Sequence, residues 1–444
     1  MDQTAIQPGV PAAKPMETGI QTGEPPGGPA TLLESKREPK HPALKALEVL
    51  ADLRITVTLF ALALVLVFWG TLAQVDHGIW TVVQKYFRTP LTQPIVWVPL
   101  KVVFFNTIDN QVDAIPFPSG WLIGGVMLLN LLAAHAIRFK FAWNRAGIIL
   151  IHVGIIIMML GEVITGLYQV EGSMVIQVGQ DSSLVIHPTQ SEFAIVRLDK
   201  DDVKKEHVIS IPARFLKESD TLIDQSRFPD LPFKIKVIDY MVNAELKIAV
   251  NKHATRGFGR NHKAISLPEV SGVDPDQKHD KPAVYVQLTS HKGEDLGKWL
   301  FSTHPACDTQ WITIDGVDYQ LALRFKQVAR EFTMHLNKFE HKVFPGTTTP
   351  KDFHSYIHLT DPKNGVDRPN VEIYMNAPLY YNGETFYQSS WTTDLQGRAN
   401  GTVLQVVRNP GWLMPYISCG VVGIGLLIHF GLTLYRFIDR RIVR

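Results

Sequence analysis

Cysteine is nearly absent from this chain of 444 residues, which contains two cysteines, Cys307 and Cys419. They lie far apart in the sequence and form no Cys-x-x-Cys pair, so the chain cannot carry out dithiol exchange by itself. The sequence also lacks a His-Glu-x-x-His metal helix, a glycine-rich phosphate loop and a Gly-x-Ser-x-Gly nucleophile turn. These absences argue against an enzyme.

A strong charge of either sign is missing as well. The formal net charge is +2, and no basic stripe of the kind that binds nucleic acid occurs. What the chain does contain is four long apolar runs, near residues 55–75, 121–137, 146–167 and 412–437. A helix needs about 20 residues to cross the hydrocarbon core of a bilayer. The sequence therefore predicts four transmembrane helices in contact with membrane lipid.

Lysine and arginine flank these runs on one side of the membrane. They cluster in residues 36–54, 138–145 and 436–444. Because short basic segments stay in the cytoplasm, we expect residues 76–118 and 168–411 to lie on the opposite side. The interpretation is a multi-pass protein of the bacterial inner membrane whose large domain faces the periplasm.

Composition changes along the chain predict its domains. A proline-rich stretch with few large apolar residues is typical of a disordered cytoplasmic tail, and it lacks the features of a signal peptide. An aromatic loop between the first two spans is expected to lie along the outer leaflet or to pack over the helix ends. The predicted domains are the tail at 1–45, the first helix at 46–75, the loop at 76–118, the second and third helices at 119–167, a β-rich domain at 168–411, and the last helix with its basic end at 412–444.

The region between the third and fourth spans has the pattern of strands. Asp315-Gly316 and Asn382-Gly383 are signals for type I′ hairpin turns. Many short strands with such turns favour an antiparallel sandwich or open barrel, whereas residues 251–281 are aperiodic and predict a mobile loop. The predicted strand runs are 173–178, 192–198, 208–211, 233–238, 283–289, 311–314, 317–323, 356–359, 371–375, 384–388 and 402–407.

Three histidines lie within the predicted spans. An imidazole at membrane depth is costly, so it marks a functional site whose partner should be sought. For His152, ligation of a metal or cofactor competes with a plain hydrogen bond to a neighbouring helix. For His135, near the cytoplasmic end of the second span, the favoured interpretation is contact with headgroup water. His429 is expected at a depth similar to His152, where two imidazoles either ligate one iron or bond between helices; Glu162 is expected to reach the outer surface instead of pairing with His152.

Several short motifs, in this order, resemble the ResB family, also called CcsB, of cytochrome c biogenesis. The order of parts also matches, with three spans, a large outer β domain and one last span. The motifs are Gly70-Thr71-Leu72-Ala73-Gln74, Leu150-Ile151-His152-Val153-Gly154, Glu171-Gly172, Phe344-Pro345-Gly346 through Pro350, Phe353-His354-Ser355, and Asn376-Ala377-Pro378-Leu379 followed by Gly383 and Phe386-Tyr387-Gln388-Ser389-Ser390.

The resemblance implies a non-catalytic subunit of System II, which delivers haem for cytochrome c synthesis. It implies a CcsA- or ResC-type membrane partner, apocytochrome c as client and a separate thioredoxin-like reductant. In the family a histidine of the early spans is thought to ligate haem iron, and the matching position is His152, with His135 and His429 as further cofactor-binding candidates. A neutral imidazole is a good ligand for haem iron.

A rival interpretation is a membrane-anchored β-domain receptor or structural subunit without a cofactor. In that case the histidines of the spans are hydrogen-bonding residues alone. The chain also departs from the common bacterial members in its proline-rich tail, its aromatic loop, Glu162 and the 251–281 segment. These departures indicate a divergent subfamily. The overall expectation is a mixed membrane protein with four transmembrane α-helices and a large antiparallel β-rich extracytoplasmic domain.

Overall fold

The computed structural model describes residues 41–90, 92–105, 107, 113–138, 142–198, 206–250, 253–270, 279–347, 350–394 and 396–442. The predicted disordered tail, apart from its last residues, lies outside them. Contacts divide the chain into Met1–Ala46 and Leu47–Arg444. Of the first unit the structure describes the beginning of helix α1 (Pro42–Leu50), and the other described elements belong to the second. The finer division into domains predicted from the sequence stays a prediction.

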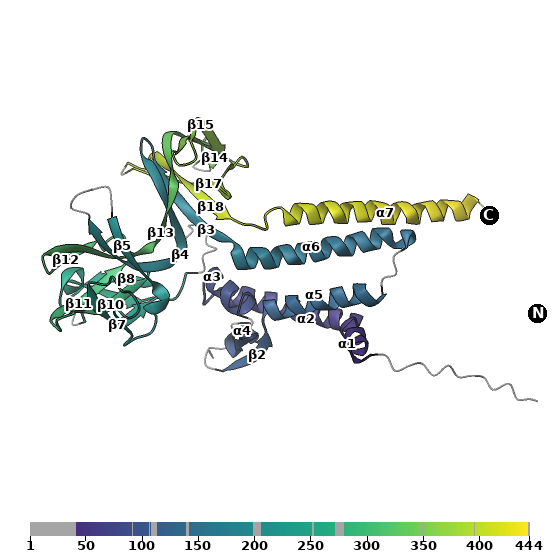
Figure 1. The fold of residues 1–444 in the computed structure, drawn as a ribbon, viewed down its shortest axis with the longest axis horizontal. Coiled ribbons are helices and arrows are strands. Elements are labelled where there is room, and N and C mark those ends of the chain that lie inside the picture. The colour runs from purple at the N-terminus through teal and green to yellow at the C-terminus, as the bar shows by residue number, and fades with distance from the viewer. Residues whose placement is uncertain are drawn as a thin grey trace, which may run out of the picture. The chain divides into compact units, whose positions relative to one another are not determined.

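Four helices are long and apolar enough to cross a membrane, which confirms the predicted spans (Figure 1). They are α2 (Leu53–Ala73), α5 (Gly120–Arg138), α6 (Ala146–Tyr168) and α7 (Met414–Ile442). Their bounds lie within a few residues of the apolar runs, because the length of each run sets the length of helix that can be buried in lipid.

Helices α2 and α5 are joined by a polar contact within the apolar region. Asn130 of α5 is 3% exposed; its Oδ1 accepts a hydrogen bond from Thr56 Oγ1 at 2.6 Å, and its Nδ2 donates to Leu50 O at 2.6 Å. Such a side chain is stable in a membrane because both ends of its amide are bonded. The contact fixes α5 against the junction between α1 and α2.

Helices α6 and α7 pack through a stripe of glycine. Gly147, Gly154 and Gly161 recur every seven residues of α6 and are all buried. A Cβ added at Gly154 would lie 2.5 Å from Val422 Cγ2, and one at Gly147 would lie 2.7 Å from Gly425 O. Small residues of this kind let two backbones approach closely. Ser418 Oγ also donates to Gly154 O at 2.7 Å.

The segment after α2 folds into a small cap instead of a plain connector. It contains α3 (Ile79–Val82), the π-turn η1 (Val83–Phe87), α4 (Leu100–Val103), and the antiparallel pair β1 (Ile95–Pro99) and β2 (Ala114–Pro118). Buried valines of β1 and α4 join Leu66 of α2 and Ile123 of α5 in one apolar cluster. This agrees with the predicted packing over the helix ends.

The β-rich region contains two larger antiparallel sheets, as predicted. One has the order β15-β14-β13-β4-β3-β18-β17-β16, with β12 and β5 beside β13 and β4; the other has the order β11-β10-β7-β6. The strands are β3 (Val170–Gln177), β4 (Asp181–Leu198), β5 (Glu206–Pro212), β6 (Leu222–Ile223), β7 (Phe233–Met241), β10 (Ala283–Ser290), β11 (Asp295–Ser302), β12 (Gln310–Ile314), β13 (Val317–Val343), β14 (Pro350–Asp361), β15 (Val366–Tyr374), β16 (Leu379–Tyr381), β17 (Glu384–Thr393) and β18 (Ala399–Arg408).

Two apolar cores fill this region. Strands β7, β10 and β11 pack on β4, β5, β12 and β13 around a core that includes Phe193, Phe233 and Phe301. The edge strands β15 and β16 of the larger sheet contact each other, so this sheet curls around a second core that includes Met174 and Phe332. The region therefore combines a sandwich with a barrel-like sheet.

Every predicted strand run overlaps a strand, with residues 178 and 375 just beyond the ends of β3 and β15, and both predicted turns are confirmed. Asp315 and Gly316 have φ of 49° and 77° between β12 and β13, and Asn382 and Gly383 have φ of 50° and 73° between β16 and β17. The predicted loop at 251–281 was partly wrong. Residues 262–266 form β9 (His262–Ser266), which pairs with β8 (Ala244–Ile248), while residues 251–252 and 271–278 lie outside the described part.

Candidate functional site

The structure brings two of the membrane histidines into direct contact. The rings of His135 on α5 and His152 on α6 lie edge to face, with centroids 5.0 Å apart. The expectation that His135 would simply reach headgroup water missed this contact. The short connection from α5 to α6 places the two residues at equal distances from its centre, near residues 143 and 144. In an antiparallel helix pair such positions lie at the same depth, and this spacing was the signal available in the sequence.

Hydrogen bonds define the tautomer of both rings. His135 Nδ1 donates to Leu131 O and His152 Nδ1 donates to Ile148 O, each at 2.8 Å. A backbone carbonyl can only accept, so Nδ1 carries the proton in each ring. In the neutral imidazole the lone pair then resides on Nε2. Histidines that bind metals usually have their other nitrogen held in this way by a carbonyl or carboxylate.

His429 does not join this pair. Its backbone nitrogen would lie 2.5 Å from a Cβ added at Gly147, whereas Gly154, close to His152, packs on Val422. His429 therefore lies about one and a half turns, or ~7.5 Å, nearer the N-terminal end of α6 than His152 does, and its ring contacts Phe430. The expected match in depth was wrong because the glycine stripe, not the distance from the outer end, sets the register of α6 against α7.

Glu162 is likewise separate from His152. Its Oε1 lies 3.4 Å from Nη2 of Arg88, which follows η1, and its side chain is 72% exposed. The carboxylate therefore pairs with a cation of the cap, in line with the expectation that it would not pair with His152.

The donor set fits one axial ligand to haem from this chain. Both imidazoles present the nitrogen type that binds haem iron, yet their edge-to-face contact leaves no room for a porphyrin between them. In this arrangement they cannot bind opposite faces of the same iron. Within the described ranges no three His, Cys, Asp or Glu side chains form a cluster able to hold a metal ion.

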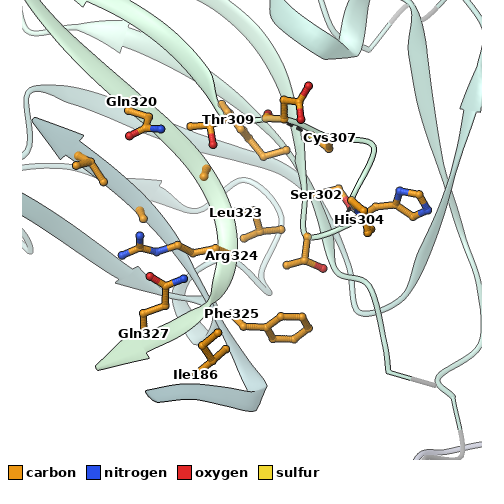
Figure 2. A pocket seen from close by; sticks show the side chains of 17 residues that line it. Ile186, Ser302, His304, Cys307, Thr309, Gln320, Leu323, Arg324, Phe325 and Gln327 are labelled. Atoms are coloured by element: carbon orange, nitrogen blue, oxygen red, sulfur yellow. Dashed lines mark hydrogen bonds between the residues drawn. The ribbon is translucent and has the colours of Figure 1, made fainter. Parts of the chain in front are cut away.

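The β-rich region has a cavity of about 430 Å³ between β13 and the segment 301–309 (Figure 2). Arg324 lines it, and its Nε donates to Oε1 of the buried Glu192 at 3.0 Å. Cys307 lines it too, and burial, followed by the nearby Asp308 carboxylate, raises the pKa of its thiol to about 11. The thiol is therefore protonated at neutral pH and is a poor nucleophile.

Motif residues of the β-rich region link its strands through hydrogen bonds. Ser355 Oγ lies 2.6 Å from Gln388 Oε1 and 2.9 Å from Thr402 Oγ1, in a network that joins β14, β17 and β18. Next to it, the two ring nitrogens of His354 lie 2.7 Å from carboxylate oxygens of Asp352 and Glu372. These carboxylates raise the pKa of His354. The motifs here stabilise the curled sheet.

Comparison with known proteins finds two relationships. The model of the ResB-like family matches residues 137–215 and 313–400. The first range contains His152, but neither His135 nor His429. Protein NrfI of Wolinella succinogenes is 26% identical over 308 residues, which cover 68% of this chain and 29% of NrfI. The chain thus spans less than a third of the length of this relative.

Proposed function

We propose, because the ResB-like family model matches residues 137–215 and 313–400 and NrfI is 26% identical over 308 residues, that this chain is a membrane subunit of the machinery that delivers haem for cytochrome c synthesis. It acts with a CcsA- or ResC-type membrane partner and has no catalytic chemistry of its own. The bacterial inner membrane is its location, and the β-rich region faces the periplasm, as the basic residues flanking the spans favour. A thioredoxin-like protein keeps the client thiols reduced.

His152 carries the proposal. It lies within α6, about two turns from the cytoplasmic end, and the bond from its Nδ1 to Ile148 O leaves the lone pair on Nε2. That bond also restricts rotation of the ring, so the ligating nitrogen keeps one direction. His152 would ligate the iron of the haem through Nε2, and the partner would provide a further ligand.

The other residues around His152 act through it. His135 packs its ring against that of His152 at 5.0 Å and limits the space in which the latter can turn. Gly154 allows α7 to pass close by, where Ser418 bonds to the carbonyl of Gly154. Haem, when bound, supplies the vinyl groups to which the client cysteines become attached. The chain's own task is to orient and shield it.

The test is the haem content of the complex. The chain, with a tag that contains no histidine, is coexpressed with its CcsA-type partner, purified, and assayed by the pyridine haemochrome spectrum. We expect His152→Ala to lower haem per complex about tenfold or more, since loss of supporting residues alone costs 10–100-fold in metal affinity. His429→Ala is the matched control and should retain haem, because it lies about one and a half turns away from His152 and its ring contacts Phe430 instead.

A further variant separates ligation from packing. His135→Phe keeps an aromatic edge against His152, so the complex should stay coloured with at most a small shift of the absorption bands. Unchanged haem in His152→Ala would remove the ligand assignment. A colourless wild-type complex would instead favour the rival function, a membrane-anchored receptor or structural subunit without cofactor.

A further inference from the structure

One edge of strand β13 changes partner and leaves a gap. Its residues from Gln320 to Phe325 pair with β4 along one edge. On the other edge β12 pairs with it up to Leu321, and β14 begins to pair at Thr333. Among the described residues no strand pairs with that edge between these two points.

The turn between β12 and β13 determines which backbone groups face the gap. In a two-residue hairpin the residues next to the turn, here Ile314 and Val317, form a hydrogen-bonded pair, and such pairs then alternate along the ladder. Val317 and Leu321 therefore present N–H and C=O toward β12. The next groups on this edge belong to Leu323 and Phe325, beyond the end of β12.

The cavity lies along this same gap. On one side it is lined by residues 320, 322–325 and 327 of β13 and by residues 186, 194 and 196 of β4; on the other side it is lined by residues of the segment 301–309, which leads into β12. Figure 2 shows the side chains of Leu323 and Phe325 on the side of the strand that faces this segment, and Arg324 on the other side. The segment turns away before it can extend β12, and this departure creates the space.

The side chains that line the cavity indicate which kind of ligand it can bind. Arg324 is already paired with Glu192, so its charge is not available to an anionic ligand, and the thiol of Cys307 is protonated. The other lining residues include apolar side chains and polar ones such as Asp308, Gln320 and Gln327, and the edge of β13 adds a row of backbone donors and acceptors. A strand edge of this kind binds an extended peptide by main-chain hydrogen bonds, while side pockets take alternate side chains. A volume of about 430 Å³ lies within the ~300–1,000 Å³ of ligand pockets.

We propose that this gap is a binding groove for an extended segment of an unfolded polypeptide, which adds as a strand to β13 beside Leu323 and Phe325. If the proposed function is right, that polypeptide is the haem-free client, which lacks the folded structure that would hide its backbone. An extended segment of four residues spans about 13 Å. The apolar side chains of the segment pack on Phe325, which is partly exposed, while Leu323, 3% exposed, offers its backbone.

Crosslinking tests the location of the groove. A photoreactive phenylalanine is placed at Thr309, which lines the cavity, or at Trp311, which is two residues further on and 52% exposed. The full-length protein in detergent is mixed with a reduced, haem-free c-type cytochrome and illuminated. We expect a crosslink from position 309 to the haem-free form, and none to the folded holocytochrome. The control position 311 should give at least tenfold less product.

Hydrogen exchange tests the mode of binding. Addition of a strand should slow exchange of the amides of Leu323 and Phe325 about tenfold or more, and leave that of Leu336, which already donates to Gln180 O at 3.1 Å, unchanged. Phe325→Ala should weaken binding roughly tenfold, the loss expected for a buried aromatic contact. Thr309→Trp, which fills the groove without removing a core residue, should do the same.

The outcomes separate this groove from the proposed function. If an unrelated unfolded protein, such as reduced carboxymethylated lactalbumin, protects these amides and the haem-free cytochrome does not, the groove stands and the client assignment fails. If the cytochrome crosslinks equally from position 311, or binds without protecting Leu323 and Phe325, the groove is ruled out while the haem function stands. Crosslinking of the folded holocytochrome from position 309 would also overturn the proposal.

Discussion

At the scale of single residues, hydrogen bonds orient the membrane histidines. Many buried histidines bond to a neighbouring helix, and His135 and His152 also direct Nδ1 to carbonyls of their own helices. That bond leaves the lone pair of each neutral ring on Nε2. Measurement of haem in His152→Ala separates the haem proposal from the receptor alternative.

His354 gives a prediction on pH dependence. Its folded pKa is raised by Asp352 and Glu372, so its contribution to stability is fully present below the unfolded value of 6.5 and is lost as pH rises through the folded pKa. The pKa of Asp352 is lowered, chiefly by the hydrogen bond from His354, so the carboxylate's contribution is lost as pH falls below 3.8. The pair is strongest between these limits.

His354→Gln should therefore lower the unfolding temperature most near pH 5–6. About 2 °C is expected, the shift given by ~1 kcal/mol in a domain of this size, since the partly exposed carboxylates are screened by solvent. Thermal unfolding of the full-length protein from pH 4 to 9 measures it. The difference from wild type should shrink above neutral pH, and a constant difference across this range would show that His354 acts through packing alone.

At the scale of elements, the glycine stripe of α6 predicts which substitutions separate two helices. A Cβ at Gly154 would lie 2.5 Å from Val422 Cγ2 and 3.0 Å from Ser418 O. Gly154→Leu must push α7 away and break the bond from Ser418 Oγ. We expect a loss of about 1–3 kcal/mol, typical of overpacking, seen as a lower unfolding temperature in detergent.

The matched control is Gly420→Leu on α7, where a Cβ meets no atom within 4 Å. It should keep the wild-type unfolding temperature, because it adds apolar surface at a position with open space. Equal destabilisation by both substitutions would mean that leucine perturbs these helices for a reason other than contact between α6 and α7.

The elements differ in how well their sequence predicts them. Alternation of apolar and polar residues located the strands, because each has one buried face, and Asn382-Gly383 marked its turn by its need for positive φ. Strand β9 was not predicted because it is five residues long and includes His262 and Lys263. The full length of β13 was not predicted either, since its pairing passes from β12 to β14 and bulges interrupt the alternation of its side chains.

The candidate site was predicted in part for the same physical reasons. His152 stood out because a polar side chain inside an apolar run is rare. Its contact with His135 depends on how two helices face each other, and the position of His429 depends on glycine packing, so neither follows from hydropathy. The groove beside Leu323 depends on where one strand ends and another begins, which is a property of pairing and not of any local pattern.

At the scale of the whole molecule, the proposed orientation gives a prediction on labelling. Asp315, in the turn between β12 and β13, should face the periplasm, whereas Arg440, near the end of α7, should face the cytoplasm. In a background of Cys307→Ser and Cys419→Ser, an impermeant maleimide added to spheroplasts should label Asp315→Cys several-fold more than Arg440→Cys. Lysis should make the two equal. The reverse preference would invert the topology and move the β-rich region to the cytoplasm.

The packing of α6 on α7 also determines when the helix bundle can form during biosynthesis. The two helices are separated by about 245 residues of chain, which a ribosome adding ~5–20 residues per second needs roughly 12–50 s to translate. During that interval the glycine face of α6 cannot yet pack on α7, and strand β3 cannot yet pair with β18, its neighbour in the sheet. The helix bundle and the larger sheet therefore cannot be completed until about the last tenth of the chain has been translated. We expect a chaperone or the translocon to shield helix α6 until α7 is available.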